Sequence, residues 1–523
     1  MKTNRGERHF LKGALLLTYA GLIGKVLSAF YRIPLQNLTG DVGFYVYQQV
    51  YPFIGMTSIL ALYGMPAAIS RLVATREEPL SSAVKKRILI QLILFALTLI
   101  IMVYSLAPHI ATVMQDVQLT QVIQSSVVLF IPFPILAYYR GLSQGENHMT
   151  PTALSQLIEQ VVRVSLIILS SYIVSQYAYS IYTVGVGATF ASAIGALIAA
   201  GVLYRLHQKK SLAFDQPAKD PEFSHRQLVS LILGTGFVMA INHMLLLLLQ
   251  LVDALTLVPQ LERYGMVLAE AQVLKGILDR GQPLSQIGII VASSLTLSVV
   301  PSVTQSRLKN DTETFVQAIR STWKLTLILS SAASLGLITL FSEVNELLFK
   351  EDLETFSLQI FTLSIIFISL SISSAAILQG LGFIYRTALF VLIGVVSKVL
   401  FNILFIPYFH ITGAALATVL ASVVILSLNM VEIKRQIPNE RLFNIKVKGW
   451  MYSLVQMVAI LYVFNRVANE ILLPLSRIQL LFYVLFIVSL GAFIYVRGIV
   501  SKRVLTNAEL NSLPLLHRFA KKE

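Results

Sequence analysis

Long apolar segments alternate with short polar loops along the whole chain. A bilayer core of ~30 Å requires about 20 apolar residues for one helical crossing. The apolar segments predict crossings at residues 10–33, 44–70, 88–108, 119–139, 152–175, 179–204, 228–256, 284–306, 321–341, 356–379, 387–408, 411–431, 449–468 and 478–497. The pattern therefore predicts an all-α polytopic membrane protein with about 14 transmembrane helices.

The basic residues of the loops predict the orientation. Of the 41 Lys and Arg residues, 31 lie at the termini or in loops that would share their side of the membrane. Lys and Arg are enriched in cytoplasmic loops, so we expect both termini in the cytoplasm and the protein in the plasma or inner membrane. Only six basic residues lie on the opposite side: Arg263, Lys275, Arg280, Lys350, Arg466 and Arg477. Insertion topology and contact with anionic membrane lipids account for the net charge of +15, and no nucleic-acid partner is expected.

Composition supports the membrane class and argues against an enzyme. Charged residues make up 13% of the chain, about half of what soluble proteins carry. The chain has no cysteine, which excludes disulfides and thiolate metal sites. No Walker loop, HExxH or GxSxG motif is present, and the short loops leave no room for a folded extramembrane catalytic domain. We expect a transporter without a cofactor or resident metal, driven by a partner gradient such as that of a coupling ion, by the membrane potential, or by consumption of the product outside.

The two halves of the chain repeat each other at an offset of 235 residues. Pro66 aligns with Pro301, and Gln144-Gly145 aligns with Gln379-Gly380. Residues 152–164 share seven identities in 13 positions with residues 387–399, and Arg163 aligns with Lys398. Six crossings separate equivalent helices, and because six is even the two halves have the same orientation. Parallel repeats of this kind build transporters that rock around a central cavity.

The repeat predicts the domain organisation. Residues 1–204 form an N-lobe of six helices, residues 205–227 a basic cytoplasmic linker, and residues 228–432 a C-lobe of six helices. Residues 433–523 add two helices and a cytoplasmic tail.

A set of local sequences, in this order along the chain, resembles a known superfamily. They are Gly24-Lys25-Val-Leu, Tyr31-Arg32, Gly40-Asp-Val-Gly-Phe44, Tyr63-Gly-Met-Pro-Ala-Ala-Ile-Ser-Arg71, Asp279-Arg-Gly-Gln-Pro283 and Ile411-Thr-Gly-Ala-Ala415. Together with two six-helix lobes and two extra helices, they resemble the multidrug/oligosaccharidyl-lipid/polysaccharide exporters, in the MurJ/SpoVB-like branch. The resemblance implies a flippase that moves an undecaprenyl-pyrophosphate-linked sugar from the inner to the outer leaflet for cell-envelope synthesis.

One departure from the branch concerns its substrate. Members that handle the peptidoglycan precursor usually have two arginines six residues apart in helix 1 and further arginines in helix 2. Here Lys25 and Arg32 are seven apart, and Val46 to Ser70 contains no arginine. Two alternatives to the flippase stay open: a cation-coupled multidrug antiporter of the same superfamily, and a non-transporting scaffold of an envelope-synthesis complex.

Charged residues within the predicted helices are the first candidates for a substrate site. A charge at the bilayer centre costs ~2.5–3.5 kcal/mol on insertion scales, so it persists when it is paired or faces a watery cavity. Six such residues carry a net charge of +2, which suits an anionic lipid headgroup: Lys25, Arg32, Glu159, Arg163, Asp253 and Lys398. Glu159 and Arg163 share a helix face and can pair structurally, or Glu159 can hold Arg163 ready for substrate. Arg32 and Asp253 lie near helix ends and can instead reach the membrane interface.

Uncharged polar residues form a second group of candidates. Gln48 and Gln49 lie among the tyrosines of helix 2, where they can meet sugar hydroxyls if the tyrosines are not simply interfacial anchors. Helix 7 carries Asn242, His243, Gln250 and Asp253. The last three share one side of an ideal helix, so this side can line a cavity or bind a cation, or His243 can be an ordinary packing residue.

Overall fold

The protein is helical throughout the part that the computed structural model describes, and that part contains no strand. It covers residues 16–17, 19–75, 80–177, 179–211, 224–308, 312–437, 445–471, 476–506 and 509–510. The start of the first predicted crossing, most of the predicted linker and the C-terminal residues 511–523 lie outside the described residues.

The chain forms two compact units. The first combines Met1–Asp279 with Ile384–His410, and the second combines Arg280–Phe383 with Ile411–Glu523. These units are defined by which residues pack together, and their bounds are not those of the lobes expected from the sequence repeat. The division into two six-helix lobes stays a prediction. Helices α12 (Leu268–Leu308) and α17 (Ile384–Gln436) contribute to both units.

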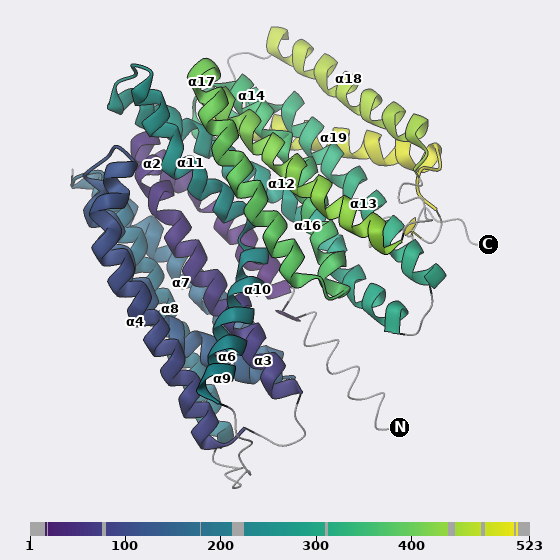
Figure 1. Ribbon diagram of the computed structural model, residues 1–523. Coiled ribbons are helices and arrows are strands. Elements are labelled where there is room, and N and C mark those ends of the chain that lie inside the picture. The colour runs from purple at the N-terminus through teal and green to yellow at the C-terminus, as the bar shows by residue number, and fades with distance from the viewer. Residues whose placement is uncertain are drawn as a thin grey trace. The chain divides into compact units, whose positions relative to one another are not determined.

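The first unit holds the N-terminal helices and the beginning of the C-terminal half (Figure 1). After a helix at residues 19–30, its elements are α2 (Arg32–Ile59), η1 (Leu60–Gly64), α3 (Met65–Ala74), α4 (Ser82–Val113), α5 (Leu119–Ser125), η2 (Ser126–Phe130), α6 (Phe133–Gly145), α7 (Met149–Gln176), α8 (Thr183–Ser211), α9 (His225–Val229), η3 (Ser230–Thr235), α10 (Gly236–His243) and α11 (Leu245–Arg263).

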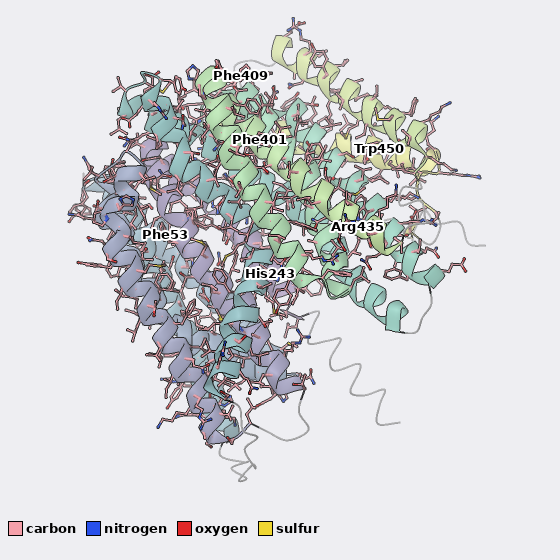
Figure 2. All side chains as sticks on the ribbon, in the orientation of Figure 1. Phe53, His243, Phe401, Phe409, Arg435 and Trp450 are labelled. Atoms are coloured by element: carbon pink, nitrogen blue, oxygen red, sulfur yellow. The ribbon has the colours of Figure 1, made fainter. Side chains whose placement is uncertain are left out.

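The second unit contains α13 (Thr312–Thr339), α14 (Phe341–Phe349), α15 (Thr355–Thr362), α16 (Ser364–Gly380), α18 (Val447–Ile471) and α19 (Arg477–Ser501). Polar contacts fix α18 and α19 to α13. The indole nitrogen of Trp450, near the start of α18 (Figure 2), donates to Ser331 Oγ at 3.3 Å. The hydroxyl of Tyr495 on α19 donates to the carbonyl oxygen of Ile328 at 2.9 Å. The last two long helices are therefore integral to this unit.

Among the described residues, eleven helices are long and apolar enough to cross a bilayer. Two of them are unusually long, Tyr19–Ala74 with 56 residues and Ile384–Gln436 with 53. Each contains one non-helical residue at positive φ, Gly40 (φ 67°) and His410 (φ 50°). Each break lies between two of the crossings expected from the sequence. The protein is therefore a multi-pass, all-helical membrane protein.

Helix ends agree with the 235-residue offset. Helix α6 ends at Gly145 and α16 ends at Gly380. Helix α7 begins at Met149 and α17 begins at Ile384. The turn between the two helices therefore has the same length in both copies of the Gln-Gly sequence.

Helices α2, α3 and α10 of the first unit approach very closely at one crossing. A Cβ atom on Gly64 would lie 2.8 Å from the carbonyl oxygen of Gly236, so glycine is required there. A π-helical turn adjoins each glycine, η1 before Met65 and η3 before Gly236. Such turns are rare and often occur at functional sites.

Candidate functional site

A buried carboxylate of the first unit is shared by two arginines. On α7, Glu159 pairs with Arg163 one turn later, and its second oxygen accepts a hydrogen bond from Arg140 Nη2 of α6 at 2.8 Å. Arg140 also donates to Ser155 Oγ at 3.1 Å and is only 1% exposed. One carboxylate cannot neutralise two guanidinium groups, so this triad keeps one positive charge.

The triad is held against neighbouring helices by tight packing. Arg163 Nη2 donates to Ser58 Oγ on α2 at 3.0 Å. On α8, a Cβ atom at Gly195 would lie 2.8 Å from the carbonyl oxygen of Glu159, so the absence of a side chain lets α8 approach α7 at this level. Sequence reasoning missed Arg140 because it placed the end of the fourth crossing at residue 139. The sequence did contain a signal that this helix continues past residue 139, because the Gln144-Gly145 pair that recurs in the second half of the chain lies at the end of α6.

A second buried ion pair joins α11 and α17. Lys398 Nζ lies 2.8 Å from Asp253 Oδ1, with the two side chains 0% and 2% exposed. Asn402 donates to the same oxygen at 3.0 Å and to Thr256 Oγ1 at 2.7 Å. The expectation that Asp253 reaches the membrane interface is wrong, because the ion pair and the Asn402 hydrogen bond hold it in the interior. An ammonium group of the chain itself already balances its charge.

A third pair lies where the sequence predicted an outer loop. Lys275 and Asp279 are four residues apart on α12, and each side chain is 2% exposed. Arg280, in the second unit, is fully buried and pairs with Glu351 at 2.9 Å. Lys275 and Arg280 therefore lie in a buried helix and not in an exposed loop, while the side of the membrane on which they lie stays a prediction. Helix α12 begins at Leu268, 16 residues before the predicted crossing at 284. Hydropathy did not predict the first part of this helix as a buried segment, because the charged residues Lys275, Asp279 and Arg280 lower its apolar content. In the fold these charges are neutralised by ion pairs.

Arg32 is buried and forms no ion pair within the part of the chain that the structure describes. It is 0% exposed, and none of its guanidinium nitrogens has a hydrogen-bond partner among the described residues. Its guanidinium carbon lies 4.1 Å above the centre of the Tyr51 ring, and Tyr31 and Tyr47 are also close enough to interact with its charge. The interpretation of Arg32 as a side chain that reaches lipid headgroups is therefore wrong. An isolated buried charge is costly, which makes this arginine a candidate binding group.

Among the four cations predicted within the membrane helices, Lys25 is the second that has no carboxylate partner in the described residues. It lies in the middle of the helix at residues 19–30 and is exposed, as is His243 of α10. His243 stacks on Tyr63 with ring centres 4.6 Å apart, and the charge of Lys25 acts on it. An exposed charge at this depth requires water around it. Lys25 and His243 are thus both accessible on the surface of the first unit, and Figure 2 shows the position of His243.

The glutamines of α2 point inward. Gln48 and Gln49 are 5% and 0% exposed, and each has a side-chain oxygen without a partner. Gln49 also donates to the carbonyl oxygen of Ala254 at 3.2 Å. The neighbouring Tyr45 and Tyr47 are fully buried, so they are not interfacial anchors.

The polar residues of helix 7 do not form one surface. A break at Met244 and the π-helical turn η3 interrupt the ideal helix on which that expectation rested. His243 is exposed and Gln250 is half-buried, whereas Asp253 is buried in its ion pair. Asn242 is structural, since it donates to the carbonyl oxygen of Ile384 at 3.0 Å and fixes the start of α17.

Together, the charged residues of the first unit leave a positive surplus in its interior. The buried basic members are Arg32, Arg140, Arg163, Lys275 and Lys398, and the buried acidic members are Asp116, Glu159, Asp253 and Asp279. The exposed Lys25 adds a further positive charge. Arg163 and Lys398 belong to separate ion pairs, while Lys25 and Arg32 carry charge without an ionic partner in the described chain. Cations beside unpartnered amide oxygens are suited to a ligand with both phosphate and hydroxyl groups.

Comparison with known proteins agrees with this description. The family model "Polysaccharide biosynthesis protein" matches residues 10–307. The uncharacterized membrane protein YabM of Bacillus subtilis is 34% identical over 98% of this chain and 97% of its own length. Lipid II flippase MurJ of the same organism is 26% identical over 81% of this chain and 82% of its own. Stage V sporulation protein B of Bacillus subtilis is 24% identical over 98% of this chain and 99% of its own length.

Solved structures show the same fold. A structure of Lipid II flippase MurJ in an inward closed conformation matches with a TM-score of 0.68 at 14% identity, over 94% of this chain and 99% of that one. An inward-facing multidrug resistance transporter of the MATE family matches with a TM-score of 0.60 at 14% identity. The match covers 82% of this chain and 100% of that one. The chain belongs to the polysaccharide biosynthesis protein family, in the MurJ-like branch of the multidrug/oligosaccharidyl-lipid/polysaccharide exporter superfamily.

Proposed function

We propose that the protein is a flippase for a lipid-linked saccharide, which it moves from the inner to the outer leaflet for cell-envelope synthesis. The observation that carries this proposal is Arg32, a fully buried guanidinium without a hydrogen-bond partner among the described residues, together with the unpaired Lys25. A pyrophosphate carries about two negative charges and several acceptor oxygens, so it can supply the counter-charge and the hydrogen-bond acceptors that Lys25 and Arg32 do not find in the described chain.

The ion pairs give the remaining charges a supporting role in this proposal. Arg163 is held by Glu159, and Lys398 by Asp253. Ligand phosphates reach Lys25 and Arg32 first, while the triad around Glu159 adds a fixed positive field. Gln48 and Gln49 offer acceptor oxygens to sugar hydroxyls. A cationic drug would be repelled by this surplus, which argues against the multidrug antiporter.

Depletion of the protein tests the proposal in cells. A flippase that is lost leaves its substrate in the inner leaflet, so one lipid-linked saccharide should accumulate while its polymerised product decreases. Mass spectrometry of extracted polyprenyl-linked lipids identifies that species, and re-expression of the protein should restore its normal level. Unchanged lipid-linked precursors in fully depleted cells would contradict the proposal.

The proposed direction of transport requires both termini to be cytoplasmic. Because the chain has no cysteine of its own, single-cysteine variants report topology directly. Cysteine at Gln115 or Asp352, which are both exposed, should react with an impermeant maleimide in intact cells, whereas cysteine at the exposed Ser82 should react only after permeabilisation. Asp116 next to Gln115 is 2% exposed and is unsuitable for labelling. Labelling of Ser82→Cys from outside would reverse the orientation.

A further inference from the structure

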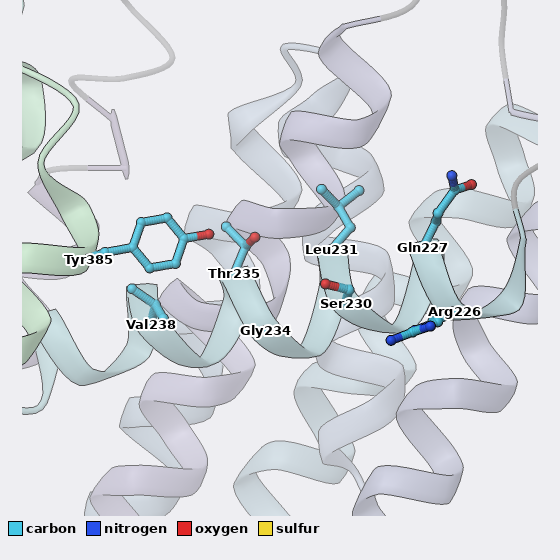
Figure 3. A pocket seen from close by; sticks show the side chains of 8 residues that line it. All are labelled: Arg226, Gln227, Ser230, Leu231, Gly234, Thr235, Val238 and Tyr385. Atoms are coloured by element: carbon cyan, nitrogen blue, oxygen red, sulfur yellow. The ribbon is translucent and has the colours of Figure 1, made fainter.

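A separate pocket lies where the seventh crossing begins. It has a volume of about 590 Å³ and lies within the first unit, between the α9–η3–α10 segment and the start of α17 (Figure 3). Arg226 and Gln227 lie at one end of it, and Thr235 and Tyr385 lie at the other (Figure 3). None of the charged or glutamine residues discussed as the central site contributes to its lining.

The lining of this pocket is suited to an anion. Arg226 supplies a permanent positive charge, and the lining contains no acidic residue. Gln227, Ser230 and Thr235 add hydrogen-bond donors, and Figure 3 shows the Tyr385 hydroxyl directed toward Thr235 across the pocket. Arginine with neighbouring hydroxyl and amide donors is a preferred environment for phosphate oxygens.

Local backbone structure keeps the pocket open. Ser230 to Thr235 form the π-helical turn η3. On Gly234, a Cβ atom would meet only Ser230 Oγ, at 4.0 Å, so the floor of the pocket is free of packed side chains. The opposite wall is fixed because Asn242 donates to the carbonyl oxygen of Ile384, the residue before Tyr385.

The position of the pocket indicates a lipid as the source of the anion. Arg226 ends the basic segment of the chain between residues 205 and 226, and the membrane-spanning part of the same crossing follows at Leu245–Arg263. The pocket is therefore at the level where helices leave the bilayer and lipid phosphates gather. On the same stretch, Val229 and Phe237 are exposed, at 39% and 48%, and offer an apolar surface for an acyl or prenyl chain.

We propose that this pocket binds the phosphate headgroup of a membrane lipid through Arg226, Ser230 and Tyr385, with the lipid chain lying along Phe237. The ligand chemistry is a phosphate ester on a long apolar chain. Both an anionic phospholipid and a polyprenyl phosphate have this chemistry. The site is separate from the central cations and does not depend on which saccharide is transported.

The test uses the full chain in phosphatidylcholine nanodiscs, with bound lipid counted by native mass spectrometry. Dioleoyl phosphatidylglycerol, undecaprenyl phosphate and inorganic pyrophosphate are titrated separately. Arg226→Gln removes the charge, and Gly234→Leu fills the pocket without displacing a packed group. Arg226→Gln should weaken lipid binding by about tenfold or more, the loss expected for a charge-assisted hydrogen bond. Gly234→Leu should weaken it at least as much, because the new side chain occupies the space of the headgroup.

Two matched controls make the same kinds of substitution at positions outside the pocket. Gly201→Leu makes the same change on α8, where nothing lies within 4 Å, and Arg205→Gln removes another exposed charge of the basic segment. Both should bind lipid as the wild type does. If undecaprenyl phosphate binds more tightly than phosphatidylglycerol, the pocket is a docking site for the substrate lipid. If the two lipids bind equally tightly, the pocket is a general site for anionic lipids. Inorganic pyrophosphate binding as tightly as the lipids would overturn the proposal, and so would equal losses in the Gly201→Leu control.

Discussion

Replacing Arg32 with methionine is expected to stabilise the protein while abolishing transport. The guanidinium of Arg32 is fully buried and makes no hydrogen bond in the described chain, although its charge acts on the carboxylate of Asp279. Methionine has a similar length and removes this desolvated charge. Replacing a whole buried ion pair or triad with apolar residues is often neutral or stabilises other proteins by about 1–4 kcal/mol, and removing a buried arginine that has no ion pair to lose should also stabilise. Substrate phosphates would lose their most deeply buried cation, so transport should fall by more than about tenfold.

Thermal denaturation of the purified protein and complementation of depleted cells measure these two effects. Arg466→Met is the matched control, because Arg466 on α18 and its ion-pair partner Glu470 are both exposed, at 72% and 65%, so the change should alter neither property. A structural role for Arg32 predicts the opposite pattern, in which Arg32→Met loses stability and transport in proportion. That result would remove Arg32 from the binding site.

Replacing Glu159 with glutamine should destabilise the protein more than replacing either of its arginines. Glutamine leaves both Arg140 and Arg163 as uncompensated buried charges, and breaking a buried ion pair in this way costs about 3–5 kcal/mol. Arg163→Gln leaves the pair between Arg140 and Glu159 intact and should cost about 1.5–3 kcal/mol, as for other hydrogen bonds to charged groups. The order of stabilities follows from the presence of two arginines and one acid.

Combined variants distinguish this triad from a simple pair. The double variant Glu159→Gln with Arg163→Gln should stay unstable, because Arg140 remains without its carboxylate, and adding Arg140→Gln should recover stability. Denaturation midpoints in detergent give this comparison. Glu470→Gln, at an exposed pair with Arg466, is the control and should cost at most ~0.5 kcal/mol. Full rescue by the double variant would show that Arg140 does not share the charge.

Hydropathy and the charge of the loops predicted the helical membrane class well, because each crossing needs a long apolar run. The same reasoning failed where charges neutralise each other in the folded protein. Lys275 and Asp279 interrupt the apolar pattern, yet they pair on α12 and are buried with it. Arg140 lay one residue beyond a predicted helix end, and its partner Glu159 is distant in sequence.

The candidate site was only partly visible in the sequence. Three of the four predicted cations, Arg32, Arg163 and Lys398, are buried in the first unit, whereas Lys25 is exposed. The sequence could not tell which of the four are paired. Arg163 and Lys398 align in the repeat and each has an acidic partner, one on its own helix and one on α11. Arg32 lies near a helix end, where linear position suggested the interface, and only the packing of the tyrosines around it shows its burial. Pairing depends on contacts between helices, which a single sequence does not record.

Flipping of a fluorescent polyprenyl-pyrophosphate saccharide in reconstituted vesicles tests the central claim most directly. Wild type, Lys25→Gln, Arg32→Gln and the exposed control Arg466→Gln are compared at equal protein per vesicle, and a membrane-impermeant quencher reports the labelled lipid in the outer leaflet. Lys25→Gln and Arg32→Gln are expected to flip the lipid at close to the rate of protein-free vesicles, while Arg466→Gln should flip it as the wild type does. Wild-type flipping by both Lys25→Gln and Arg32→Gln would contradict the role of the unpaired cations as the substrate's phosphate-binding groups.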